Sequence, residues 1–228
     1  CFSFLEHFLH SASCRSSATL YVMLTNHYWY MPNAFTRKEC DYLEKKGKES
    51  FEAHSKDGFH FGEDPLKRSS QISWVDDKMS VAMVEELAHT ANIDAGWVLD
   101  LVRSEAIQYT VYAEGDEYDW HTDGHQDRYA AKHLVGTADD PMPLNQTTNP
   151  LLAGLVRKLS LTVNLSCPED YEGGTLELLF HEQHHTFLER APRGSAIIFP
   201  SFIKHRITPI TKGTRKSAVM WFNGPPIR

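Results

Sequence analysis

From Glu105 onward, short alternating or apolar runs are separated by turn residues, and this pattern restricts the possible folds more than any other feature of the chain. Such runs are typical of a β-sandwich or barrel, whereas βαβ units would place helical segments between the strands. The expected strands are residues 105–114, 118–123, 157–166, 174–180, 184–188, 195–199, 204–209 and 215–223. Eight short strands favour a double-sheet jelly roll, so we expect a mainly β fold with supporting α-helices.

The residues before this strand-rich part predict two helices. Thr36-Arg-Lys-Glu39 has the form of a capping box, which predicts a helix over residues 36–50. Apolar residues at helical spacing between Met83 and Ala91 predict a second helix that ends near Gly96. Residues 71–75 form a short extended run, and residues 55–70 mix glycine, proline, histidine and charge, which favours a loop that could serve as a mobile flap.

The length of the chain favours a single domain. At 228 residues, with 41% hydrophobic and 11% aromatic residues, the chain can build a substantial core. Residues 1–22 differ in composition and form an atypical segment, so the expected domain covers residues 23–228. Within it, residues 33–98 provide helical support and residues 99–228 the jelly-roll core, interrupted by an insertion at residues 124–156. Loops of that length are usually functional or disordered.

Composition argues against several classes of partner. The formal net charge is -7, with 30 acidic and 23 basic residues, so no cationic field exists to attract nucleic acid or an anionic membrane. No apolar run approaches the roughly 18 residues that cross a bilayer, and Glu6, His7 and His10 interrupt the first stretch where a secretory signal would be apolar. The four cysteines lack paired spacing, which favours reduced thiols. We therefore expect a cytoplasmic protein, and the sequence leaves its oligomeric state open.

A candidate metal site combines two distant segments. His121 and Asp123 lie two residues apart in an expected strand, so both side chains would point to one face. A third ligand has to come from elsewhere, and His205, after the apolar run 196–199, is the best candidate. Two imidazoles and one carboxylate are the ligand set that leaves open positions on non-haem ferrous iron. The sequence therefore predicts an iron-dependent oxygenase.

A candidate co-substrate pocket lies on the last strand. Arg215, Ser217 and Trp221 alternate along residues 215–221, which places them on a common face. An arginine inside a barrel needs a partner, and a dicarboxylate would bind its guanidinium in a bidentate fork, with Ser217 as a further donor. Tyr112, on the strand before His121, could contact the other end of the same molecule, and Trp221 would form a wall of the pocket.

The order and spacing of these motifs resemble a known family. The pattern between Arg68 and Pro225 is similar to the prolyl 4-hydroxylase-like branch of the Fe(II)/2-oxoglutarate-dependent dioxygenases. The matching motifs are the tyrosine before His-x-Asp, Glu-Gly-Gly-Thr-Leu-Glu at residues 172–177, Gly-Ser-Ala-Ile-Ile-Phe at residues 194–199, and then His205, Arg215 and Trp221.

The resemblance implies a double-stranded β-helix (a cupin-like jelly roll) that uses Fe(II), 2-oxoglutarate and O2, with ascorbate as a candidate reductant. His121, Asp123 and His205 would hold iron, and Arg215 would bind the distal carboxylate of 2-oxoglutarate. The expected reaction hydroxylates a peptidyl residue, with proline as a candidate, or a small molecule, and releases succinate and CO2.

The chain departs from the family pattern on one strand. The animal oxygen sensors of this family carry a further co-substrate tyrosine after the iron-binding pair, where this chain reads Leu-Thr-Val-Asn-Leu at residues 161–165. Thr162 and Asn164 are candidate substitutes for that tyrosine. Arg68 and Trp74 resemble the family's segment beside the substrate entrance, although an ordinary edge strand explains them equally well.

Two alternatives from other functional classes remain open. One is a catalytically silent jelly roll that binds a ligand or a partner protein. The other is a zinc hydrolase, because His181, Glu182 and His185 fit a metalloprotease signature in which two histidines one helical turn apart bind zinc. Strand-like residues on both sides of this motif favour a hairpin turn instead, in which the two histidines would lie about 13 Å apart.

Overall fold

The computed structural model of the protein describes residues 26–55, 69–124, 130–131, 146–147, 150–180, 183–187, 189 and 191–226. Its helices are α1 (Arg37–Ser55), α2 (Lys78–Asp94) and the 3₁₀ helix η2 (Pro150–Leu152). None of the helices in these ranges is both long and apolar enough to cross a membrane.

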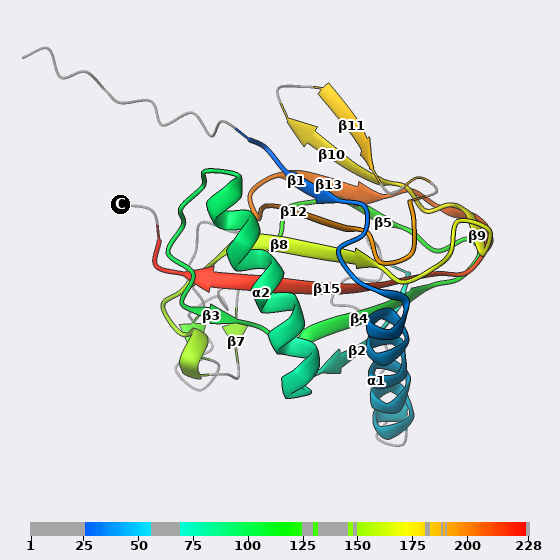
Figure 1. Ribbon diagram of the computed structural model, residues 1–228, viewed down its shortest axis with the longest axis horizontal. Coiled ribbons are helices and arrows are strands. Elements are labelled where there is room, and N and C mark those ends of the chain that lie inside the picture. Colours follow the sequence, from blue (N-terminus) through cyan, green and yellow to red (C-terminus); the bar gives the residue numbers. More distant parts are fainter. Residues whose placement is uncertain are drawn as a thin grey trace, which may run out of the picture.

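Two antiparallel sheets form the body of the molecule (Figure 1). The larger sheet has the order β1 (Trp29–Met31), β12 (Ala196–Pro200), β8 (Val156–Asn164), β15 (Arg215–Gly224), β4 (Ile107–Tyr112) and β2 (Gln71–Val75), with β3 (Arg103–Ser104) also paired to β15. The smaller sheet has the order β11 (Gln183–Phe187), β10 (Leu176–Phe180), β13 (Lys204–Ile207) and β5 (Tyr118–His121). Two further pairs join β14 (Ile210–Gly213) to β9 (Tyr171–Gly173) and β6 (Ala130–Ala131) to β7 (Gln146–Thr147).

The helices cover one face of the larger sheet (Figure 1). The capping box of α1 is formed, because the backbone N–H of Thr36 donates to Glu39 Oε2 at 2.7 Å and the Glu39 N–H donates back to Thr36 Oγ1 at 3.4 Å. In α2, the backbone N–H of Ser80 donates to the N-cap Asp77 at 3.0 Å. Alternate residues of the sheet pack against the buried side of both helices in one apolar core.

A second apolar core lies between the two sheets. Side chains from β10, β12 and β13 contribute to it, among them Leu178, Ile197, Phe199 and Ile207. Side chains of a strand alternate between its two faces, so β8 and β15 each supply one set of residues to the helix side and another to the space between the sheets. Thr162, Arg215, Ser217 and Trp221, which the sequence predicted for a co-substrate pocket, belong to this second set.

The jelly roll expected from the sequence is confirmed, as are the two helices and the extended run at residues 71–75. Several boundaries were wrong. The first helix continues to Ser55. The strands expected at residues 105–114, 118–123, 157–166, 174–180 and 204–209 are shorter, at Ile107–Tyr112, Tyr118–His121, Val156–Asn164, Leu176–Phe180 and Lys204–Ile207. The short strands β1, β3, β9 and β14 were not predicted as separate elements. Residues 56–68, most of the expected flap, lie outside the described residues, and so does most of the 124–156 insertion.

Candidate metal centre and anion pocket

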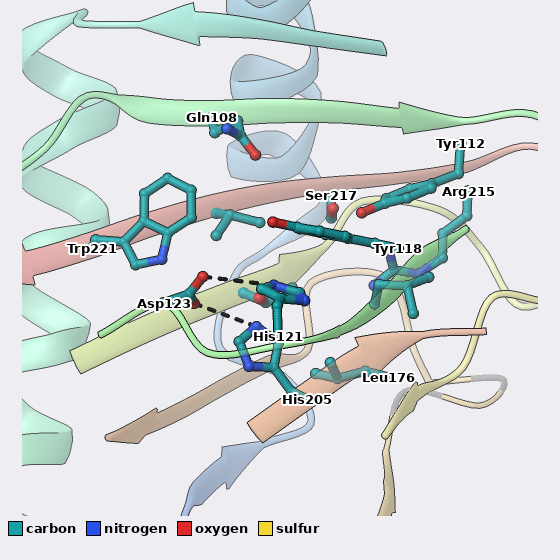
Figure 2. Close-up of a pocket in the computed structure, with 13 residues that line it drawn as sticks. Gln108, Tyr112, Tyr118, His121, Asp123, Leu176, His205, Arg215, Ser217 and Trp221 are labelled. Carbon is teal, nitrogen blue, oxygen red and sulfur yellow. Dashed lines mark ion pairs between the residues drawn. The ribbon is translucent and has the colours of Figure 1, made fainter. Parts of the chain in front are cut away.

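His121, Asp123 and His205 converge at one point of the interior, although Asp123 and His205 are 82 positions apart in the chain. The pairing of β13 with β5 sets His205 directly opposite His121, and Asp123 follows two residues after the end of β5. Asp123 Oδ1 lies 3.7 Å from His121 Nε2, and its Oδ2 lies 3.4 Å from His205 Nε2 (Figure 2). One ligand atom from each residue lies within 4.8 Å of the others, so the three can hold one metal ion.

Both imidazoles are oriented by backbone carbonyl groups. His121 Nδ1 lies 2.7 Å from the carbonyl oxygen of Asp119, and His205 Nδ1 lies 3.0 Å from that of Ile203. A carbonyl oxygen only accepts, so each Nδ1 donates to it, and Nε2 of each ring is the nitrogen that faces Asp123. Each ring thus presents Nε2 toward Asp123, and this is the nitrogen through which it would bind a metal.

The carboxylate of Asp123 is buried and held in its charged form. Ser160, on β8, donates from its hydroxyl to Asp123 Oδ2 at 2.7 Å and lies 2.9 Å from the hydroxyl of Ser201. Burial raises the pKa of Asp123, but the nearby charges of His205, His121 and Arg157 outweigh burial and lower this pKa to about 2. The side chain is thus an ionised ligand at neutral pH.

A cavity beside these three residues ends at Arg215. The guanidinium is fully buried, and its Nε, Nη1 and Nη2 atoms have no hydrogen-bond partner among the described residues. The ring of Tyr112 lies 5.6 Å from Arg215 Cζ. Gly174 leaves space for the arginine, because a Cβ atom there would lie 2.9 Å from Arg215 Cδ. A buried cation without a counter-charge is costly, so this end of the cavity is suited to an anion.

Most of the residues that the sequence predicted for the co-substrate pocket line this cavity. They are Tyr112, Thr162, Arg215, Ser217 and Trp221, together with His121, Asp123 and His205 (Figure 2). Asn164 is not among the cavity-lining residues. Its side-chain amide donates instead to the carbonyl oxygens of Ser166 and Ala191, at 3.1 and 3.0 Å. Of the two candidate substitutes for the family's tyrosine, only Thr162 therefore faces the cavity.

Trp74, the candidate substrate residue on β2, is 42% exposed, and its ring centroid lies 6.1 Å from that of Trp221. Arg157 also contacts Trp221, and its Cζ lies 3.9 Å from the centre of the indole ring. Arg157 is held in turn by Glu105 through hydrogen bonds of 2.7 and 2.6 Å. Arg68 lies outside the described residues, so its position beside the entrance stays a prediction.

Sequence reasoning missed Tyr118, which also lines the cavity. Its ring stacks on the imidazole of His121, with 3.6 Å between centroids. Residues three apart in a regular strand point to opposite faces, but the pairing of β5 with β13 shifts between His205 and Ile207, which pair with His121 and Tyr118 respectively. This bulge turns both side chains inward, and the linear sequence gives no signal for it.

The zinc alternative requires a helix, and the part of its motif that the structure describes is a strand. His185 lies in β11 and pairs with Leu178 of β10, and Gln183 pairs with Phe180 at the end of the hairpin. The imidazole of His185 stacks on the ring of Phe180, with centroids 4.0 Å apart. His181 and Glu182 lie outside the described residues. The hairpin interpretation of this segment is therefore confirmed for residues 183–187.

Residues 107–223, from the start of β4 almost to the end of β15, match the sequence model of the 2OG-Fe(II) oxygenase superfamily. The chain belongs to this superfamily. The matched segment contains every residue that converges on the cavity, and the group that the superfamily's name implies is an iron ion with 2-oxoglutarate. The residues fit both, because two histidine nitrogens and an ionised carboxylate meet at one point and an unpaired guanidinium faces the same cavity.

Relatives in sequence cover only part of the chain. A PKHD-type hydroxylase of Picosynechococcus sp. is 40% identical over 75 residues, which is 33% of this chain and 33% of the relative. A PKHD-type hydroxylase of Xylella fastidiosa is 31% identical over 114 residues, 50% of this chain and 42% of the relative. The matches thus span less than half the length of these relatives.

Solved structures match over nearly the whole chain. A viral collagen prolyl hydroxylase from Paramecium Bursaria Chlorella virus-1, in complex with 2OG, has a TM-score of 0.60 at 18% identity and covers 88% of this chain and 97% of its own. A Pseudomonas putida prolyl-4-hydroxylase has a TM-score of 0.58 at 18% identity, and the match covers 87% of this chain and 92% of the hydroxylase. At these identities the likeness establishes the fold alone, which is the jelly roll.

Proposed function

We propose that the protein is an Fe(II)- and 2-oxoglutarate-dependent dioxygenase that hydroxylates a peptidyl residue. The observation that carries the proposal is the buried, unpaired guanidinium of Arg215 in the same cavity as His121, Asp123 and His205. A metal site alone would fit many functions. A fixed cation beside it selects an anionic co-substrate that reaches the metal, and 2-oxoglutarate, with a carboxylate at each end, matches both features.

In this proposal His121, Asp123 and His205 hold the iron, and Arg215 and Ser217 bind the distal carboxylate of 2-oxoglutarate. Tyr112 and Thr162 provide further contacts to the co-substrate. Iron, 2-oxoglutarate and O2 supply the oxidising chemistry, with succinate and CO2 released. The open coordination positions that this chemistry needs follow from a set of only three protein ligands.

The protein's own contribution is binding, orientation and exclusion of water. Ser160 holds Asp123 in place, and the carbonyl groups of Asp119 and Ile203 fix the two imidazoles. Apolar side chains from three strands, Leu176, Ile207 and Val219, line the cavity with the polar groups. They keep the pocket dry, which strengthens the charge-assisted bonds of Arg215. No side chain has to act as a general acid or base for hydrogen abstraction.

A peptide substrate is supported by the aromatic residues on and next to the cavity wall. Trp74 is partly exposed and lies beside Trp221, which Arg157 also contacts. Aromatic faces of this kind suit a compact apolar ring, so proline is the candidate residue. A structural neighbour from Trichoplax adhaerens, at 14% identity and a TM-score of 0.58, is a prolyl hydroxylase in complex with a peptide fragment of hypoxia inducible factor. A small-molecule substrate is the alternative outcome.

The test measures succinate formed from 2-oxoglutarate in the presence of Fe(II), O2 and a panel of proline-containing peptides, with and without ascorbate. We expect substrate-stimulated succinate formation and a mass increase of one oxygen on a peptide. His205→Ala should abolish both and also remove iron binding. Iron binding without any 2-oxoglutarate turnover would contradict the oxygenase and favour a silent ligand-binding jelly roll.

A further inference from the structure

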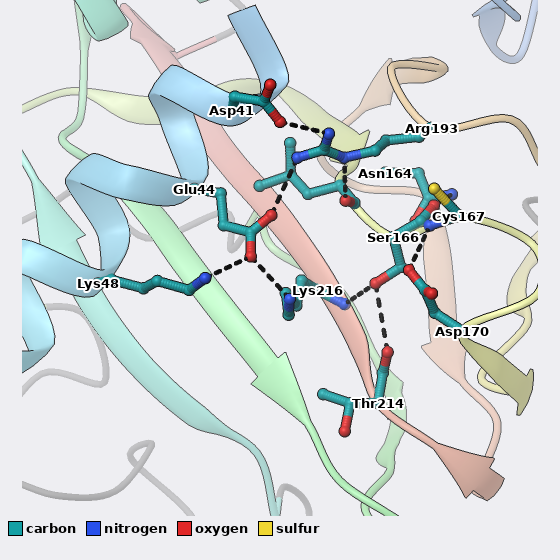
Figure 3. Close-up of polar contacts among 11 residues, drawn as sticks. Asp41, Glu44, Lys48, Asn164, Ser166, Cys167, Asp170, Arg193, Thr214 and Lys216 are labelled. Atoms are coloured by element: carbon teal, nitrogen blue, oxygen red, sulfur yellow. Dashed lines mark hydrogen bonds and ion pairs between the residues drawn. The ribbon is translucent and has the colours of Figure 1, made fainter. Parts of the chain in front are cut away.

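A polar cluster on the helix side of β15 joins the strand to α1. Lys216 follows Arg215 in β15, and its Nζ lies 2.7 Å from Glu44 Oε1 on α1 (Figure 3). Lys48 Nζ lies 2.7 Å from the same oxygen, and Arg193 Nη2 donates to Glu44 Oε2 at 2.9 Å. The carboxylate of Glu44 thus pairs with three cationic side chains, one of which belongs to β15.

The side chain of Glu44 is shielded from solvent, so its ion pairs can hold α1 and β15 together. Its side chain is 14% exposed, whereas a pair on an open surface would be weakened by water and salt. Burial raises the pKa of Glu44, but the hydrogen bonds from Lys216 and Lys48 outweigh burial and lower it. Arg193 is held on its other side by Asp41, with 2.6 Å between Nη1 and Oδ1. The cluster is therefore a connected network of charges.

The backbone of Lys216 is fixed by the same region. Ser166 Oγ accepts a hydrogen bond from the backbone N–H of Lys216 at 2.8 Å, and the Leu165 N–H donates to the carbonyl oxygen of Lys216 at 3.0 Å. The carbonyl oxygen of Leu165 in turn accepts from Arg193 Nε at 2.7 Å. Both the main chain and the side chain of Lys216 are thus anchored on the outer side of the cavity wall.

Neighbouring residues of a strand point to opposite faces, so Lys216 points to α1 and Arg215 into the cavity. None of the described residues hydrogen-bonds to the Arg215 guanidinium. Its position therefore depends on packing and on the backbone of β15. We propose that Glu44 is a positioning residue, which fixes β15 through Lys216 so that Arg215 meets the carboxylate of the co-substrate in one place. This inference rests on the proposed function.

The distinction to be tested is between positioning and stability alone. Bidentate recognition of a carboxylate is sensitive to displacements of about 0.5 Å, so a looser β15 would weaken co-substrate binding. The three iron ligands lie on β5, on the segment after it and on β13, none of which contacts Glu44 through the bonds described above. A positioning role therefore predicts weaker binding of 2-oxoglutarate with unchanged affinity for the metal.

The experiment compares Glu44→Gln, Lys216→Met and Lys48→Met by calorimetry. Each variant is titrated first with Mn(II) and then, loaded with Mn(II), with 2-oxoglutarate. Glu44→Gln and Lys216→Met should raise the Kd for 2-oxoglutarate on the order of threefold to tenfold, and the double variant should add little, because both changes break one pair. Lys48→Met is the matched control, since it removes a cation from the same carboxylate without touching β15, and its Kd should change less than twofold.

Lys216→Arg preserves a cation facing Glu44 and should keep the Kd for 2-oxoglutarate within twofold of wild type. The comparison of Lys216→Arg with Lys216→Met still tests the proposal if Glu44→Gln fails to fold. An unchanged 2-oxoglutarate Kd in Lys216→Met, whatever its unfolding midpoint, would overturn the positioning role. Equal losses of Mn(II) and 2-oxoglutarate affinity would also overturn it, because they indicate general loosening. A wild-type protein that binds Mn(II) but no 2-oxoglutarate would instead contradict the proposed function on which this inference rests.

Discussion

At the scale of single residues, the site contains one group that weakens the fold. Arg215 is fully buried and its three guanidinium nitrogens lack partners among the described residues. Leaving a charge in that state costs stability, and side chains retained at such cost commonly serve binding or catalysis. The unfavourable energy is recovered only when an anion occupies the cavity. Stability and co-substrate binding should therefore respond in opposite directions to the same substitution.

Arg215→Met tests this opposition. We expect the free energy of unfolding of the metal-free protein to rise by roughly 1 kcal/mol or more, because an unpaired charge is replaced by an apolar side chain of similar length. Binding of 2-oxoglutarate should be lost. Denaturant unfolding and calorimetry measure the two quantities. Arg206→Met is the control, because Arg206 pairs with Glu177 outside the cavity at 2.6 Å and should not affect 2-oxoglutarate. A destabilised Arg215→Met protein that still binds 2-oxoglutarate would contradict both expectations.

Ser160 supports a second prediction, which concerns the metal. Its hydroxyl donates to Asp123 Oδ2, and groups that orient metal ligands typically change metal affinity by about 10- to 100-fold when removed. Ser160→Ala should weaken Mn(II) binding to that extent in a calorimetric titration. Ser73→Ala is the matched control, because it removes a buried hydroxyl that bonds the carbonyl oxygen of Gly47, away from the site. Equal metal affinities in the two variants would show that Ser160 does not orient the ligand.

At the scale of elements, the packing of α1 on the sheet depends on a glycine. A Cβ atom at Gly47 would lie 2.2 Å from Cγ of Tyr109, which is buried on β4. Alanine is favoured over glycine inside a helix by about 1 kcal/mol, so propensity alone predicts a more stable protein. The close approach to an aromatic ring that cannot move away predicts the reverse. We therefore expect packing, and not helix propensity, to determine whether alanine at this position raises or lowers the free energy of unfolding.

Gly47→Ala should therefore lower the free energy of unfolding by roughly 1–3 kcal/mol, the range for an overpacked core. Denaturant unfolding measures the change. Lys45→Ala, on the exposed side of the same helix, should stay within about 0.5 kcal/mol of wild type. A stabilised Gly47→Ala protein would mean that α1 does not pack this closely on Tyr109.

At the scale of the whole molecule, the sequence was most informative for the last strand, where the alternation of side chains and the candidate pocket residues coincide. The alternation over residues 215–223 predicted β15 and the shared face of Arg215, Ser217 and Trp221 together. The strands β3 and β9, of two and three residues, are too short to show alternation and were missed. The inward turn of Tyr118 depends on the pairing of β5 with β13, and the exclusion of Asn164 from the cavity depends on backbone carbonyls. Neither is encoded in local periodicity.

The last prediction concerns acid stability of the metal-free molecule. The pKa of Asp123 is lowered from 3.8 to about 2, because the charges of His205, His121 and Arg157 outweigh the effect of burial. A carboxyl group whose pKa is lower in the folded state contributes stability that is present above its unfolded pKa and lost as the pH falls through its folded pKa. Between about pH 4 and pH 2, wild type should thus lose up to about 2 kcal/mol through this group alone.

Asp123→Asn removes the titrating group while keeping an acceptor for Ser160, so its unfolding free energy should fall less steeply over the same range. Urea unfolding at several pH values, with a chelator present, gives both curves. Other carboxylates titrate equally in the two proteins, so the difference between the curves isolates Asp123. Parallel curves would mean that the histidines and Arg157 do not stabilise the charged form of Asp123, and the electrostatic basis of the proposed iron ligand would then be wrong.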